Sequence, residues 1–187
     1  ASYNTAIGYA SLSDNTTGEQ NTALGFEALY RNTTGTYNTA IGSQALEYAT
    51  TVSGNTAIGS FALQVSTSGS NNTAVGYAVM DANTSGGNCT AFGSHTLGQN
   101  TTGDENTAFG KRAMYDNTTG EYNTAIGLHT LYSNSTGTYN TAVGYATGDN
   151  ITTGDYNTAL GNIAADNITT GSGNICIGHQ AGGSASP

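Results

Sequence analysis

The side chains that could do chemistry are few in this chain of 187 residues, which contains three histidines and two cysteines. His95 and His129 lie 34 residues apart, two of the 17-residue repeats described below. At the spacing of stacked strands they would be about 10 Å apart, too far to bind one metal ion, and His179 is farther away. Cys89 and Cys176 would be about 24 Å apart, beyond the reach of a disulfide. The sequence therefore predicts surface histidines and small, buried, unpaired cysteines.

Carboxylates near the repeat boundaries are the other candidates for chemistry. Asp104, Glu105, Asp116 and Glu121 could contribute oxygen ligands to Ca²⁺, but the D-x-D-x-D spacing of a calcium loop is missing. The chain also lacks G-x-S-x-G, a phosphate loop, H-E-x-x-H and C-x-x-C. We therefore expect solvated turn carboxylates, no metal, no cofactor and no catalytic residues, so the chain is not predicted to be an enzyme.

Ten asparagines precede x-Ser/Thr and are N-glycosylation sequons. They are Asn15, Asn32, Asn71, Asn83, Asn88, Asn100, Asn117, Asn134, Asn150 and Asn167. Six of them fall in one recurring turn, so turn chemistry alone generates most of the set. In a source that glycosylates asparagine, sugars are expected to line one edge of the molecule.

Composition excludes two classes of partner. Three basic residues, Arg31, Lys111 and Arg112, stand against twelve acidic ones, for a net charge of -9. No basic track could neutralise phosphates, so nucleic acid is not expected as a partner. No apolar run is long enough to cross a bilayer, so membrane insertion is not expected either.

These residues are positioned by a repeat that covers the whole chain. Copies that open on N-T-A-x-G, or a close variant, start at residues 4, 21, 38, 55, 72, 89, 106, 123, 140, 157 and 174. The spacing is 17 residues every time, without an insertion. A period that never slips indicates copies stacked one on the next. We therefore predict one domain over residues 1–187, an all-β, flattened β-solenoid of eleven coils.

Within a copy, the third place is Ala except at Cys176, the fourth is apolar and the fifth is Gly. Side chains alternate along a strand, so Thr at the second place and the apolar residue at the fourth share one face. We expect that face to be buried and its apolar column to form the core ladder. The column is Ile7, Leu24, Ile41, Ile58, Val75, Phe92, Phe109, Ile126, Val143, Leu160 and Ile177. The Gly column indicates either a bend with positive φ or close approach of another backbone.

A second apolar column, mostly Leu or Met, follows at the ninth place, and a turn of the N-T-T-G type follows that. Each coil is therefore expected to hold two strands of about five residues. In the ninth and tenth copies the ninth place shrinks to Gly148 and Ala165, while Ile151 and Ile168 replace the turn Asn. This exchange of volume predicts that both places line the same core.

Aromatic residues recur in register and are expected to stack along the coils. One ladder contains Tyr37, Tyr122, Tyr139 and Tyr156, and a second contains Tyr30, Tyr115 and Tyr132. They are expected to fill gaps between coils or chains. The aromatic residues after the Gly column, such as Tyr9, Phe26, Tyr77 and Tyr145, predict a surface that another chain covers.

The unit from Asn123 to Tyr139 resembles the repeats of phage tail-fibre-like and bacterial surface fibre proteins. More remotely, A-I-G is similar to the head repeats of trimeric autotransporter adhesins, although that unit is shorter and carries an extra residue before A-I-G. The resemblance implies presentation and adhesion at a cell or virion surface, with a cell-surface or glycan ligand and no catalytic residues.

Two functions follow as expectations. The first is a structural or adhesive extracellular fibre segment, and the second is an ice-binding solenoid that uses the ladder of Thr5, Thr22, Thr39 and their successors. The expected burial of that face counts against ice binding.

The length of the chain is 11 × 17, and Tyr3 lies in the phase of Tyr37. This phase predicts head-to-tail stacking into filaments with an axial repeat of roughly 53 Å. The alternative is that residues 1–187 are an excerpt of a longer chain.

Overall fold

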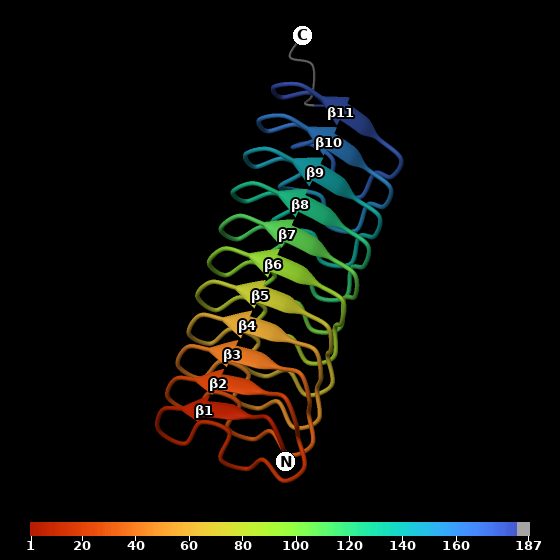
Figure 1. Ribbon diagram of the computed structural model, residues 1–187. Coiled ribbons are helices and arrows are strands. Elements are labelled where there is room, and N and C mark those ends of the chain that lie inside the picture. The colour runs from red at the N-terminus through yellow and green to blue at the C-terminus, as the bar shows by residue number, and fades with distance from the viewer. Residues whose placement is uncertain (183–187) are drawn as a thin grey trace.

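The computed structural model describes residues 1–182, which form a stack of similar coils (Figure 1). Each coil contributes one three-residue strand to a single parallel sheet whose strand order is the chain order. The strands are β1 (Thr5–Ile7), β2 (Thr22–Leu24), β3 (Thr39–Ile41), β4 (Thr56–Ile58), β5 (Thr73–Val75), β6 (Thr90–Phe92), β7 (Thr107–Phe109), β8 (Thr124–Ile126), β9 (Thr141–Val143), β10 (Thr158–Leu160) and β11 (Ile175–Ile177). Thr5 pairs with Thr22 and Ala6 with Ala23, and this register continues along the sheet. The predicted all-β solenoid is confirmed.

The prediction of two strands per coil is wrong. Beyond the Gly column, alternate residues have left-handed backbone conformations, for example Glu27 at φ 55° and Leu29 at φ 50°. This segment still bonds to its neighbours, since the amide of Leu12 donates to the carbonyl of Ala28 at 2.9 Å. Left-handed residues at every second place turn the segment away from the extended conformation, so it does not form a strand.

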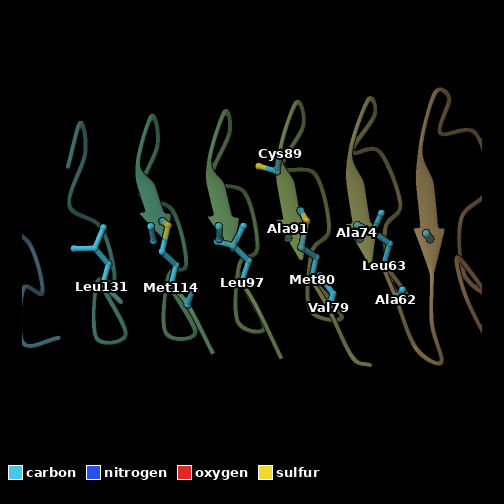
Figure 2. Packing of buried hydrophobic residues seen from close by; sticks show 14 of the residues in the cluster. Ala62, Leu63, Ala74, Val79, Met80, Cys89, Ala91, Leu97, Met114 and Leu131 are labelled. Atoms are coloured by element: carbon cyan, nitrogen blue, oxygen red, sulfur yellow. The ribbon is translucent and has the colours of Figure 1, made fainter. Parts of the chain in front are cut away.

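The core is built from the second apolar column and the small residues facing it. Leu29, Leu46, Leu63, Met80, Leu97, Met114 and Leu131 are all fully buried. Figure 2 shows several of them in a row, beside Ala74 and Ala91 of the strands. The core is therefore about one large side chain thick, with alanine as its second wall.

The core ladder predicted at the fourth place is wrong, because that column faces outward. Ile7 is 59% exposed and Ile126 is 41% exposed, whereas Ala125 between Thr124 and Ile126 is fully buried. Side chains alternate along the strand as expected, but the inner and outer faces are exchanged. The inner space is already filled by the Leu column and by the buried asparagines, so only Ala fits on the strand's inner side.

Both explanations that the sequence left open for the Gly column apply, a positive φ and the close approach of another backbone. Gly127 has φ +133°, and a Cβ there would overlap the carbonyl oxygen of Gly144 in the next coil. Backbones at this corner therefore approach as closely as glycine permits, in a conformation that side chains disfavour.

The predicted exchange of volume in the later coils is confirmed. A Cβ on Gly148 would lie 3.0 Å from Leu131 and 3.1 Å from Ile151, whose side chain is fully buried. Ile151 thus fills the space that the missing side chain leaves.

Asparagine at the first place closes each coil and links it to the next. In the second copy, the Nδ2 of Asn21 donates to the carbonyl of Gly35 at 2.8 Å, and its Oδ1 accepts from the amide of Asn38 at 3.0 Å. We call this set the strand Asn column. It is Asn4, Asn21, Asn38, Asn55, Asn72, Asn106, Asn123, Asn140, Asn157 and Asn174, with Cys89 in place of the sixth member. Buried amides that are satisfied in this way hold the coils in register.

We expect Cys89→Asn to stabilise the protein. The amide of Cys89 still donates to the Oδ1 of Asn72 at 2.9 Å, but the thiol offers only a weak acceptor where other coils present a carboxamide oxygen. Restoring the carboxamide adds hydrogen bonds worth about 0.5–1.5 kcal/mol each. Urea unfolding should show a higher midpoint for Cys89→Asn, while Cys89→Ala serves as the control that restores no bond. Equal midpoints for the two variants would contradict the proposed role of this column.

Asparagine at the turn forms a second ladder that is interrupted. The Nδ2 of Asn100 donates to Asn83 at 2.9 Å and that of Asn117 to Asn100 at 2.7 Å. The Oδ1 atoms of Asn32 and Asn134 are buried without a partner. In the next coil, Ala49 takes the place equivalent to Asn32, and Ile151 takes the place equivalent to Asn134. Neither side chain can donate a hydrogen bond, so the ladder stops at these two oxygens.

The interruption after Asn32 predicts that substitutions at Ala49 and Val52 have strongly coupled effects on stability. Val52 is buried where other coils have Gly, and a Cβ at the equivalent Gly35 would overlap the Oδ1 of Asn32. Ala49→Asn alone should therefore clash with Val52, and Val52→Gly alone should leave a cavity. The double variant regains the Asn–Gly pair, so thermal unfolding should give a coupling energy of about 0.5–3 kcal/mol. Additive effects would show that the two places do not share space.

Candidate interaction face

The strand threonines and the apolar column beside them form a continuous surface along the whole sheet. We call these two columns, the second and fourth places of every copy, the outer face. Its most exposed apolar members in the fourth-place column are Ile7, Leu24, Ile58, Phe109, Ile126, Leu160 and Ile177. Phe92 and Phe109 stack with their ring planes 4° apart and their centroids at 4.8 Å. The outer face therefore exposes an apolar stripe beside a row of hydroxyls.

The strand threonines are half-buried or exposed. The threonine hydroxyls that donate to backbone carbonyls lie elsewhere, in the turns and at the eighth place. Thr33 donates to Thr50 at 3.0 Å, and Thr96 donates to Gly110 at 2.7 Å. Within residues 1–182, the outer-face hydroxyls are thus left to solvent or to a partner.

Charge is concentrated away from this face. The second, fourth and sixth places of all copies in the sequence contain a single Lys, Arg, Asp or Glu, which is Lys111. The twelve acidic residues fall in other columns, such as Glu27 after the Gly corner and Asp104 near the turn. Approach of a second chain of the same charge is therefore least opposed at the outer face.

Aromatic residues at the sixth place flank the outer face. Tyr9 and Phe26 stack at 5.4 Å, and Tyr77 and Tyr145 are more than half exposed. These rings add exposed aromatic surface just beyond the Gly corner in several coils, and Tyr77 packs there against Phe61 and His95. Cover of this surface by another chain, which the sequence predicts, stays a prediction.

His95 and His129 are parts of an aromatic array. His95 lies between Tyr77 at 5.3 Å and Tyr115 at 6.4 Å, and its Nδ1 lies 2.8 Å from the hydroxyl of Ser94. His129 stacks on Tyr132 at 5.0 Å. Residues 1–182 contain no group of three His, Cys, Asp or Glu side chains that could hold a metal ion.

Both cysteines are free and buried, as predicted. Burial raises the pKa of Cys89 to about 11, so its thiol is protonated at neutral pH. A protonated, buried thiol is a poor nucleophile, which removes Cys89 as a reactive residue in the folded chain.

Asp104 and Glu105, two of the four candidate carboxylates, lie in separate contacts. Asp104 accepts from the amide of Gly87 at 2.6 Å. The pKa of Tyr122 is raised, mainly by the negative charge of Glu105 and next by its neighbour Tyr139. Asp104 therefore bonds to the backbone of the preceding coil, whereas Glu105 acts on the Tyr122 hydroxyl through its charge.

The structure divides the sequons by burial. Asn32, Asn83, Asn100, Asn117 and Asn134 are fully buried, and each Nδ2 group donates to the carbonyl of the glycine three residues further along the turn. In the folded chain these five cannot carry a glycan, so the predicted row of sugars along the turn edge is wrong there. Asn15 is half-buried, and Asn71, Asn88, Asn150 and Asn167 are exposed. Glycosylation at these five stays a prediction.

The sequence contains a signal for the outer face that a hydrophobicity rule misses. The fourth place varies in size from Val75 to Phe92, whereas the third is Ala in every copy but one. A tightly packed core restricts volume, so the invariant small residue marks the inside and the variable large residue the outside.

In residues 1–182, no helix is long and apolar enough to cross a membrane. Comparison of the chain with protein-family models, curated proteins and solved structures finds no match.

Proposed function

We propose that the protein is a non-enzymatic structural segment of an extracellular or surface fibre, which associates side by side with other copies through the outer face. The observation that carries this proposal is the outward orientation of the apolar column of the sheet, whose members are exposed or half-buried in all eleven coils. A chain that exposes isolated apolar residues needs no explanation, but an unbroken row of them indicates a surface that becomes covered.

The energetics favour a second copy as the cover. Burying apolar surface contributes about 25 cal/mol per Å², and the outer column supplies such surface in every coil. The other sides of the rod hold all of its acidic residues and repel a like-charged copy. Side-by-side packing is therefore directed to the outer face.

The resemblance of the 17-residue unit to fibre proteins supports the same proposal, together with adhesion to a cell-surface or glycan ligand. Head-to-tail stacking is a separate prediction that concerns the ends of the rod. Its Pro187 end lies outside the described residues.

Electron microscopy of the purified chain tests the proposal. We expect particles wider than one rod, and single rods for the double variant Ile58→Ser/Ile126→Ser, which removes two exposed outer-face residues. The control Tyr37→Ser/Tyr156→Ser removes two more strongly exposed residues from another column and should leave the wide particles intact. Wide particles in the Ile58→Ser/Ile126→Ser variant would show that another surface mediates assembly.

A second candidate function, ice binding, is supported by the orientation of the strand threonines. The burial that was expected to count against it does not occur, because the threonine ladder lies on the outer face. A regular row of hydroxyls beside apolar groups can order water, but only on a rod whose outer face is free. Thermal hysteresis with faceted ice crystals, measured on the monomeric rod, would favour this function, and its absence would leave the fibre proposal.

A further inference from the structure

Three tyrosines of successive coils form a parallel stack on the surface. The rings of Tyr122 and Tyr139 have centroids 4.8 Å apart and planes at 2°, and Tyr139 and Tyr156 have values of 5.0 Å and 2°. Their exposed fractions are 42%, 47% and 63%. We call these three residues the tyrosine stack.

Oxidation of the folded chain is directed to tyrosine. Trp is absent from the sequence. Met80, Met114 and Cys89 are fully buried, and Cys176 is 7% exposed. The sulfur groups that an oxidant usually attacks first are thus shielded, whereas the phenols of the tyrosine stack face solvent.

We propose that the tyrosine stack is a site of oxidative cross-linking, at which dityrosine forms between neighbouring coils of one chain. This inference goes beyond the proposed fibre function and does not depend on it. The oxidant belongs to the class of haem peroxidases acting with hydrogen peroxide.

The reaction balances with one peroxide for each cross-link. Two phenols each give one electron to the oxidant and one proton to water, which leaves two tyrosyl radicals. An ortho carbon of one ring bonds to an ortho carbon of the other. The hydrogens on those two carbons move to the phenoxyl oxygens, which restores both aromatic rings. Hydrogen peroxide takes up the two electrons and two protons and becomes two molecules of water.

Geometry favours coupling within the stack over coupling between chains. The partner ring is already held about 5 Å away, and tethered partners react at high effective concentration. The rings are exposed, so each can turn about its side-chain bonds to bring the ortho carbons together. Tyr139 has a neighbour on both sides, which makes it the member that both cross-links require.

A second stacked pair provides a contrast within the same molecule. Tyr115 and Tyr132 lie farther apart, at 5.5 Å and 16°. The guanidinium of Arg112 lies 5.8 Å from the ring of Tyr115, and the hydroxyl of Tyr115 accepts from Gln99 at 3.4 Å. Both rings are half-buried. We expect this pair to couple less than the tyrosine stack.

The test treats the purified full chain, at low concentration, with a plant haem peroxidase and hydrogen peroxide. We expect dityrosine fluorescence, a mass lower by two hydrogen atoms per cross-link, and linked peptides that join Tyr139 to Tyr122 or to Tyr156. Tyr139→Phe keeps a stacked ring but leaves the other two phenols about 9.6 Å apart, two strand spacings. This variant should lose most of the intramolecular product.

Tyr145→Phe, which removes an exposed tyrosine outside the stack, is the control and should react like the native chain. Far-ultraviolet circular dichroism checks that each variant is folded. No dityrosine in the native chain would overturn the proposal. So would an undiminished yield in Tyr139→Phe, or linked peptides that map to Tyr115–Tyr132 or between chains.

Discussion

Leu131→Asp is expected to unfold the coils around β8 and to lower the stability of the chain strongly. Leu131 is fully buried in a core one side chain thick, and a Cβ added at Gly148 would lie only 3.0 Å from its side chain. Removing a buried leucine side chain costs about 2–5 kcal/mol, and a carboxyl without a hydrogen-bond partner adds to that cost. Each coil contacts its neighbours alone, so the damage should begin locally.

Hydrogen exchange and urea unfolding measure this effect. Amides of the coils next to β8 should exchange first, while coils at a distance keep their protection. Ile126→Asp is the matched control, because it places the same charge in the same coil at a side chain that is 41% exposed. In a dilute monomer it should unfold close to the native midpoint. Equal damage from both variants would refute the assignment of inner and outer columns.

Gly127→Ala is the second change with a large expected effect. The backbone at Gly127 has φ +133°, and the added Cβ would overlap the carbonyl oxygen of Gly144. Such a φ costs a residue with a side chain about 1–3 kcal/mol, and the overlap with a neighbouring backbone cannot be relieved by rotating a side chain. The corner would have to open, which separates β8 from β9.

Thermal unfolding compares this variant with Gly87→Ser. At Gly87 the nearest atom to an added Cβ is the carbonyl oxygen of Ser70 at 3.0 Å, and the equivalent residues Ser70 and Asp104 of neighbouring coils carry side chains. Gly87→Ser should therefore melt close to the native chain, whereas Gly127→Ala should melt far lower. A similar melting temperature for both would show that the Gly corner tolerates a side chain.

Most of the fold could be predicted from the repeat period. A spacing of 17 residues without insertion, glycine at one corner and asparagine at the turn predict a β-solenoid with stacked coils, and the sheet of β1 to β11 has that register. The exchange between Gly148 and Ile151 was also predictable, because a closed core must conserve its volume.

Hydrophobicity alone does not show which face of each strand points into the core. Ile126 and Leu131 are similarly apolar, so a rule that places large apolar residues inside assigns both to the core. In the folded coil Leu131 is fully buried and Ile126 is 41% exposed. Which of the two side chains is buried depends on the width of the coil. That width is determined by backbone geometry, which the apolar pattern does not encode.

The prediction of a second strand failed for a related reason. Left-handed conformations are expected at glycine, yet here they occur at Leu131 and His129. Such residues carry a local conformational cost that the packing of the Leu column and the bonds between coils outweigh. Local sequence preference therefore pointed to an extended strand, while the stacked neighbours stabilise a tighter path.

The outer face as a self-association surface is the central claim, and the molar mass of the native chain in solution tests it most directly. Sedimentation equilibrium across micromolar concentrations should give a multiple of 18.9 kDa, and Ile58→Ser/Ile126→Ser should return the mass toward that of one chain. A native mass of 18.9 kDa at every concentration would contradict the claim.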